Sequence, residues 1–116
     1  EMGRHRGLGL LRGRVVRFPE GDLKVPHIGW NQLHAPRGAV LSGIREGAYA
    51  YFVHSYYALP EHSRDVLATT DYGIEFASVV GQGRIWGAQF HPEKSQEVGL
   101  QLLQNFSQLV AAEAGP

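Results

Sequence analysis

Short runs of apolar, β-branched and aromatic residues recur through the first ninety positions, and turn-forming residues separate them. The runs cover residues 15–18, 24–33, 49–59, 65–73, 74–80 and 84–90. Runs of this length and composition predict β-strands. Pro26 and Gly29 interrupt the second run, so we expect it at a sheet edge or in a loop that leaves a strand.

One amphipathic helix is predicted near the end of the chain. Ser95 is a candidate N-cap, and Gly115 followed by Pro116 is a stop signal. Between them, apolar residues fall on one face at helical spacing: Val98, Leu102, Leu103, Phe106, Leu109 and Val110. Strands followed by one closing helix predict a single α/β domain.

Composition narrows the possible functions. The chain has 116 residues, enough for one compact domain. Lys plus Arg and Asp plus Glu both number 11, so net charge gives no reason to expect nucleic acid or an anionic membrane as partner. No apolar run is long enough to span a bilayer. The chain has no cysteine, and its histidines show no metal-ligand spacing, so neither a metal nor another cofactor is predicted.

A histidine and a glutamate flank a proline directly after the last predicted strand, in GAQFHPEKS (87–95). Pro92 lacks an N–H and pushes the preceding residue away from helical geometry, so His91 is expected in an extended conformation. Side chains two residues apart then point the same way, which would bring the Glu93 carboxylate to one imidazole nitrogen. A histidine oriented by a carboxylate is the general base of a nucleophile–histidine–acid triad. By itself this short pattern is more often an ordinary turn.

Three motifs together favour the catalytic interpretation. GAQFHPEKS resembles the carboxyl-terminal signature of class I glutamine amidotransferases, in which a cysteine, this histidine and this glutamate form the triad. PHIGWNQL (26–33) and YFVHSYY (51–57) are similar to one branch of that family, the glutaminase subunits of imidazole glycerol phosphate synthase. The resemblance covers essentially the whole chain. It implies an α/β fold, the carboxyl-terminal part of a class I glutamine amidotransferase domain, with a mixed β-sheet and a closing C-terminal helix.

The resemblance also implies roles for individual positions. A cysteine thiolate would attack the side-chain amide of glutamine, His91 would shuttle the proton, and Glu93 would orient His91. In the family, glutamine is bound at positions that correspond to Ser55 and Tyr56, through their backbone, and to Glu1. Positions that face a cyclase subunit match Trp30, Asn31, Tyr51, His54 and Lys94. Without the resemblance, Trp30 and Tyr51 would be assigned to the core and Lys94 to a solvated surface.

The implied partner is a β/α-barrel cyclase that forms a heterodimer with the glutaminase and receives its ammonia. The products would be imidazole glycerol phosphate and an aminoimidazole carboxamide ribotide, made in the cytoplasm during histidine biosynthesis. Glutamine would be the substrate, with no cofactor, nucleic acid or membrane involved.

The sequence departs from the family in lacking a cysteine and the G-x-C-x-G elbow that carries it. We therefore expect residues 1–116 to be a partial domain without the nucleophile-bearing amino-terminal part, and to be inactive alone. Two alternatives stay open. Glutaminases for anthranilate, guanylate or pyridoxal phosphate synthesis share F-H-P-E, although PHIGWNQ with FVHSYY favours the histidine pathway. A catalytically dead binding module of the same fold would explain the missing cysteine, but not the retained base and acid.

Overall fold

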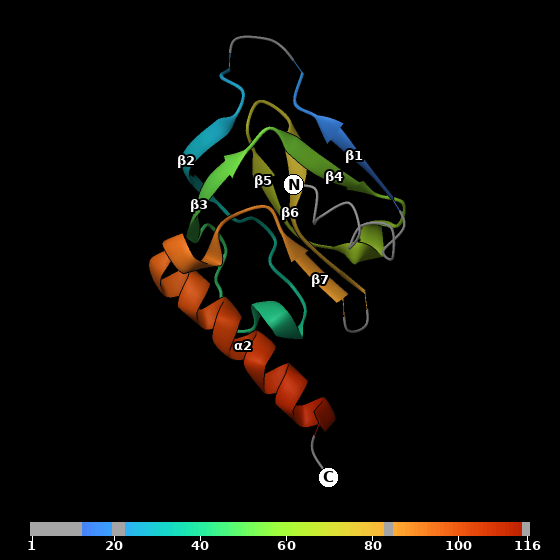
Figure 1. Cartoon of the computed structure of the whole chain (residues 1–116), viewed down its shortest axis with the longest axis vertical. Coiled ribbons are helices and arrows are strands. Elements are labelled where there is room, and N and C mark those ends of the chain that lie inside the picture. The colour runs from blue at the N-terminus through green and yellow to red at the C-terminus, as the bar shows by residue number, and fades with distance from the viewer. Residues whose placement is uncertain (1–12, 20–22, 83–84, 115–116) are drawn as a thin grey trace.

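The structure is a computed structural model that describes residues 13–19, 23–82 and 85–114. These residues form strands, short 3-10 helices and one long α-helix (Figure 1). The strands are β1 (Gly13–Arg17), β2 (His27–Gln32), β3 (Tyr49–His54), β4 (Tyr56–Pro60), β5 (Val66–Asp71), β6 (Glu75–Gln82) and β7 (Ile85–Ala88). The helices are η1 (Ala39–Leu41), η2 (Ser63–Asp65), η3 (Pro92–Lys94) and α2 (Gln96–Ala114).

The strands divide between two sheets. The larger sheet has the order β1-β4-β6-β5, with β7 also paired to β6, and the smaller sheet consists of β2 and β3. Every strand pair in the described residues is antiparallel. The single strand predicted over 49–59 is in fact two strands, because the chain bends at Ser55 and passes from the small sheet into the large one.

The small sheet has two chemically different faces. The register pairs His27 with His54 and Trp30 with Tyr51. Because side chains alternate along a strand, the first pair lies on the face opposite to the second. The inner face packs into the protein, and His27 and His54 are buried. The outer face is exposed and largely apolar, with Ile28 59% and Trp30 48% accessible. Gly29 has a φ of 128° and stays paired inside β2, and in the described residues β2 pairs with β3 alone, so it lies at a sheet edge as predicted.

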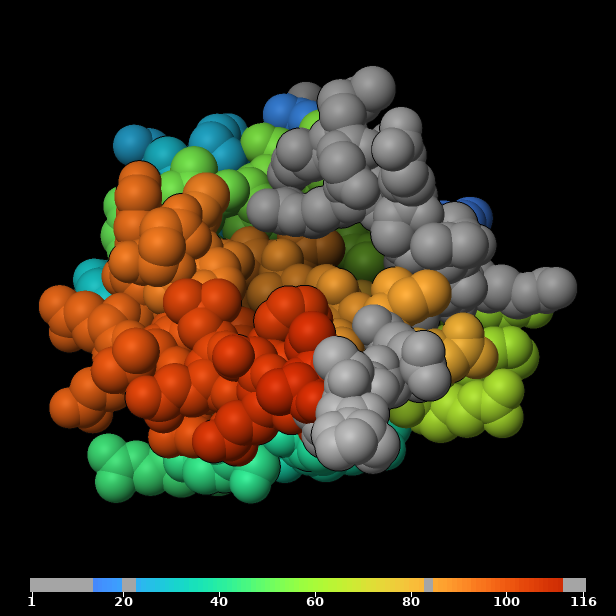
Figure 2. Space-filling view, turned by 60° about the horizontal axis from the view of Figure 1, so that its bottom comes forward, coloured from blue at the N-terminus to red at the C-terminus, as the bar shows by residue number. Residues whose placement is uncertain are grey.

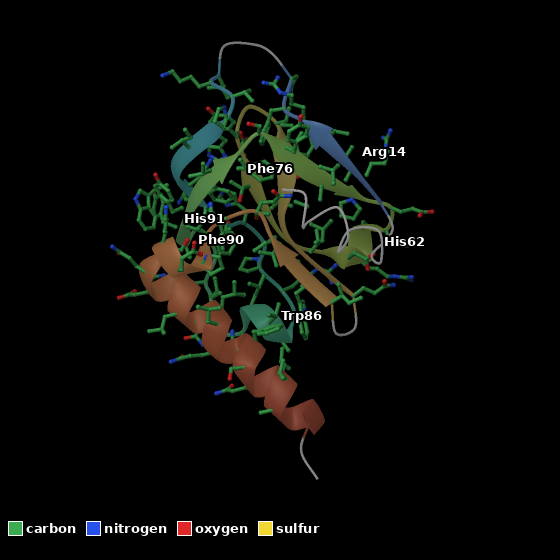
Figure 3. All side chains as sticks on the ribbon, viewed as in Figure 1. Arg14, His62, Phe76, Trp86, Phe90 and His91 are labelled. Carbon is green, nitrogen blue, oxygen red and sulfur yellow. The ribbon has the colours of Figure 1, made fainter. Side chains whose placement is uncertain are left out.

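The core is rich in aromatic rings where the two sheets meet. Phe76 of β6 (Figure 3) packs edge-on against Phe18 at 5.3 Å and against Phe52 at 5.9 Å between ring centroids. Both phenylalanines and Phe76 are almost completely buried. Edge-to-face pairs at these distances stabilise beyond simple burial. The aromatic residues predicted to make strands therefore also hold the small sheet against the large one.

The closing helix α2 follows η3 and lies across η1 and β3, so the predicted α/β class with a C-terminal helix is confirmed (Figure 1). Figure 2 shows α2 (orange to red) lying beside the segment that contains η1 (green). Leu102 is buried, whereas Leu103, Phe106 and Val110 remain exposed. The predicted apolar face exists, but the described residues cover only part of it. No helix in the described part of the chain is long and apolar enough to cross a membrane.

Candidate functional site

The segment after β7 carries His91 from the large sheet to the small one. The backbone N–H of Gln89 still donates to Ser78 of β6, 2.8 Å away. Phe90 then forms an isolated antiparallel bridge with Phe52 of β3, and the His91 N–H donates to the Tyr51 carbonyl at 2.9 Å. The ring of Phe90 is buried against Phe52. The backbone of His91 is therefore fixed at the junction of the two sheets, and its side chain projects from there (Figure 3).

Ser95 holds the turn that follows His91. Its hydroxyl donates to the His91 carbonyl at 2.7 Å and accepts the Tyr51 backbone N–H at 2.9 Å. The side chain is 1% exposed. Ser95 stands at the predicted N-cap position, directly before α2, and its carbonyl accepts the Gly99 N–H at 3.4 Å, while its hydroxyl ties the turn to β3. Both backbone polar groups of Tyr51 are bonded to this turn.

His91 and Glu93 are brought together as expected, although by a different geometry. Pro92 begins the 3-10 helix η3, so Glu93 is not in an extended segment. His91 itself is extended, with φ −92° and ψ 103°, and the tight turn then carries the carboxylate back toward the ring. The distance from Nδ1 of His91 to Oε2 of Glu93 is 3.1 Å. The contact between the two side chains follows from η3 and not from strand alternation.

This contact decides which nitrogen of His91 carries the proton. A carboxylate only accepts hydrogen bonds, so Nδ1–H is the donor and Nε2 keeps its lone pair in the neutral ring. In the described part of the chain, Nε2 has no hydrogen-bond partner. The pKa of Glu93 is lowered from its usual range, first by its own backbone N–H and next by the hydrogen bond from His91. The site thus presents an oriented base next to a carboxylate that stays ionised.

A glycine in α2 allows the turn to sit where it does. A Cβ placed on Gly99 would stand 1.6 Å from the Pro92 carbonyl oxygen. Backbone atoms cannot swing aside as a flexible side chain can, so only glycine permits this contact. The sequence alone did not predict this role of Gly99. An isolated glycine inside an amphipathic helix pattern is the signal that could have revealed it.

The predicted glutamine-binding positions lie at the bend between β3 and β4. Ser55 follows the last residue of β3, and Tyr56 begins β4. The Ser55 carbonyl accepts the Phe18 N–H at 3.0 Å, and the Tyr56 carbonyl lies 2.9 Å from Nδ1 of His54. Tyr51 is the residue of β3 that binds the His91 backbone. At the ordinary rise of a strand, Ser55 lies roughly 13 Å farther along the chain from Tyr51. Glu1 lies outside the described residues.

The five positions expected to face a partner separate into two groups. Trp30 and Tyr51 lie on the exposed face of the small sheet, with their rings edge-on at 5.6 Å, and Lys94 is exposed beside them at η3. Neither aromatic ring belongs to the buried core of this structure. His54 and Asn31 point to the opposite face because of strand alternation. His54 is 2% exposed in this structure, so its expected contact with a partner stays a prediction that the exposed surface does not support.

The inward residues form a continuous hydrogen-bonded chain. Nδ1 of His27 lies 3.0 Å from Nε2 of His54, and the Asn31 amide nitrogen lies 3.3 Å from Nε2 of His27. The same amide nitrogen donates to the Asp71 carbonyl at 2.8 Å. Within the described residues, no three groups converge in a way that would hold a metal ion. His27 and His54 lie among aromatic rings, and His27 stacks on Phe52 and on Tyr72.

Comparison with known proteins decides the family. The sequence pattern of "Glutamine amidotransferase class-I" matches residues 5–109. The chain belongs to the class I glutamine amidotransferase family. This membership agrees with the α/β class inferred from the sequence and with the position of the histidine–glutamate pair directly after a strand.

Several curated relatives belong to one branch of the family. The chain is 53% identical over 115 residues to "Imidazole glycerol phosphate synthase subunit HisH" of Desulfitobacterium hafniense, a match that covers 98% of this chain and 54% of that protein. A subunit of the same name from Natronomonas pharaonis is 58% identical over 104 residues, which cover 87% and 47% of the two chains. One from Moorella thermoacetica is 52% identical over 118 residues, covering 99% and 56%. The chain spans about half the length of these relatives.

Proposed function

We propose that this chain is the carboxyl-terminal part of the glutaminase subunit of an imidazole glycerol phosphate synthase. The observation that carries the proposal is the His91–Glu93 pair, held on a fixed turn with Nε2 of His91 unbonded in the described residues. The identity of about half with subunits of that name supports the same assignment. The complete enzyme hydrolyses glutamine to glutamate and ammonia in the cytoplasm.

In the proposed reaction each group has one task. A cysteine thiolate attacks the amide carbon of glutamine, and the imidazolium form of His91 donates its proton to the leaving ammonia. His91 then takes a proton from the water that attacks the thioester, and glutamate and free thiolate result. Glu93 keeps the proton on Nδ1, which leaves Nε2 to face the reacting atoms, and stabilises the imidazolium when it forms. Residues outside this sequence supply the cysteine, so residues 1–116 alone are inactive.

The exposed apolar face of α2 supports the proposal that this chain is part of a larger domain. Leu103 and Phe106 line a shallow apolar groove of about 160 Å³ with Trp86 of β7. Trp86 and Phe106 meet edge-on at 5.4 Å, and Val110 continues the exposed stripe toward the helix end. Apolar surface of this kind is usually covered in a complete protein. We propose that further chain of the same amidotransferase domain packs against α2 and β7.

The exposed face of the small sheet is the proposed contact with the cyclase. Ile28, Trp30 and Val53 are exposed there, and Tyr51 packs against Trp30. Large aromatic side chains are enriched at the centres of protein interfaces. Lys94, next to Glu93 in η3, places a cation at the edge of this face. The cyclase receives ammonia here and completes imidazole glycerol phosphate and the aminoimidazole carboxamide ribotide for histidine biosynthesis.

The test compares two nitrogen sources in the full-length protein assembled with its cyclase subunit. The wild type should form imidazole glycerol phosphate with either glutamine or an ammonium salt. His91→Ala should lose the glutamine-dependent reaction and keep the ammonia-dependent one, because only glutamine hydrolysis needs the base. His62→Ala is the matched control, since His62 lies across the molecule from His91 (Figure 3). Equal glutamine-dependent rates in wild type and His91→Ala would refute the proposal. A wild type inactive with glutamine but active with ammonia would favour a dead binding module.

A further inference from the structure

The buried pair of histidines under the small sheet lies beside the bend that contains Ser55 and Tyr56. His27 and His54 face each other at the ends of β2 and β3, where the register pairs them directly. Each is 2% exposed. Buried histidines cost free energy unless their ring nitrogens are hydrogen-bonded, and here the nitrogens of both rings are engaged.

The direction of every hydrogen bond in this chain can be assigned from its two ends. At one end the Tyr56 carbonyl only accepts, so Nδ1 of His54 carries a proton and donates to it. At the other end the Asn31 side-chain oxygen accepts the Gln32 N–H at 2.7 Å, while its nitrogen donates to the Asp71 carbonyl. The amide orientation is thereby fixed, and its nitrogen donates to Nε2 of His27.

The two ends agree on the bond in the middle. Since Nε2 of His27 accepts, the neutral ring of His27 carries its proton on Nδ1 and donates to Nε2 of His54. Burial, and then the neighbouring His54, lowers the pKa of His27 to about 4, which keeps this ring neutral near pH 7. Donors and acceptors thus alternate without conflict from Asn31 through both rings to the Tyr56 carbonyl.

We propose that His54, held in one tautomer by His27 and Asn31, is a positioning residue that fixes the backbone of Ser55 and Tyr56 for glutamine binding. The inference rests on the proposed function and on the family resemblance, which matches Ser55 and Tyr56 to positions whose backbone binds glutamine. The backbone of these two residues is held at two successive carbonyls, because the Phe18 N–H binds the Ser55 carbonyl and Nδ1 of His54 binds the Tyr56 carbonyl. Preorganised backbone lowers the cost of ordering the site when the substrate binds.

The experiment compares His54→Asn with His54→Leu in the full-length glutaminase assembled with its cyclase. The Asn amide nitrogen stands as many bonds from the backbone as Nδ1, so this variant keeps a donor for the Tyr56 carbonyl. Leu is closer to histidine in volume but has no donor. If the donor matters, His54→Leu raises KM for glutamine about tenfold with kcat little changed, and His54→Asn stays within about threefold of wild type. If only packing mattered, the smaller Asn would be the worse substitution, and that order would overturn the proposal.

A second readout is independent of catalysis. In ¹⁵N-histidine-labelled wild-type protein, we expect both His27 and His54 to be neutral with the proton on Nδ1. His54→Leu should remain folded by circular dichroism and should lose one of these two signals. A proton found on Nε2 of neutral His54 would overturn the positioning role even if the glutaminase activity were present. A wild type that shows both Nδ1–H tautomers but hydrolyses no glutamine would instead overturn the proposed function and, with it, this role.

Discussion

Replacing Gly99 by alanine tests how the helix positions the turn that carries His91 and Glu93. The added Cβ would lie 1.6 Å from the Pro92 carbonyl oxygen and 2.6 Å from its carbon. Ordinary contact between such atoms is about 3.5 Å, so η3 and α2 must separate by roughly 2 Å. The shift displaces His91 and Glu93, which flank Pro92.

Two effects on stability oppose each other in this variant. Alanine is favoured over glycine in a helix interior by about 1 kcal/mol. Overpacking against backbone costs about 1–3 kcal/mol, and here neither partner can rotate away. We therefore expect Gly99→Ala to lower the free energy of unfolding, whereas helix propensity alone predicts an increase. The effect on kcat should be larger, because misplacing catalytic groups by 1 Å can reduce rates about a hundredfold.

The assay measures urea unfolding and glutamine hydrolysis in the full-length protein with its cyclase. Ser107→Ala is the control, because Ser107 is exposed on the same helix and should change stability by no more than about 0.5 kcal/mol. The expected result is a less stable Gly99→Ala with kcat reduced about a hundredfold. A Gly99→Ala protein that is as stable and as active as wild type would show that the contact between Gly99 and Pro92 does not position the turn.

Three further predictions concern other parts of the molecule. The pKa of His27 is lowered from 6.5 to about 4 in the folded protein. Because the unfolded chain protonates His27 more readily, the free energy of unfolding is highest above pH 6.5 and falls by about 3 kcal/mol toward pH 4. Urea unfolding across this window measures the loss, and His27→Gln should remove this contribution; an unchanged slope would contradict it. Glu93→Gln should lower kcat at least about a hundredfold at neutral pH, and steady-state kinetics showing a near-normal kcat would exclude an orienting role. Trp30→Ala should weaken cyclase binding by about 2 kcal/mol in calorimetry, against no change for His62→Ala; equal affinities would place the interface elsewhere.

The sequence predicted most elements because their patterns were local. The short apolar runs between turn residues became strands, and the 3.6-residue spacing after Ser95 became α2. The run over 49–59 was misjudged because nothing local marks Ser55 as the point where the chain changes sheets. The change is produced by tertiary contacts, including the hydrogen bond from Phe18 to the Ser55 carbonyl.

The part of the candidate site that depends on a local motif was predicted, and the part that depends on tertiary contacts was not. His91 and Glu93 are close in sequence, so a short motif was enough to place them together. The pairing of His27 with His54 joins residues 27 apart in sequence and depends on the register of β2 and β3. That register also decides that His54 points inward, which a motif match does not reveal.

The most direct test of the account is to locate the nucleophile. The full-length protein, assembled with its cyclase and acid-quenched during turnover of glutamine, can be analysed by peptide mass spectrometry. We predict one glutamyl group in thioester linkage to a cysteine that lies outside residues 1–116, with no such adduct in the variant lacking that cysteine. Glutamate release without any cysteine adduct, or an adduct on a residue within this sequence, would contradict the assignment of His91 and Glu93 to a cysteine–histidine–glutamate triad.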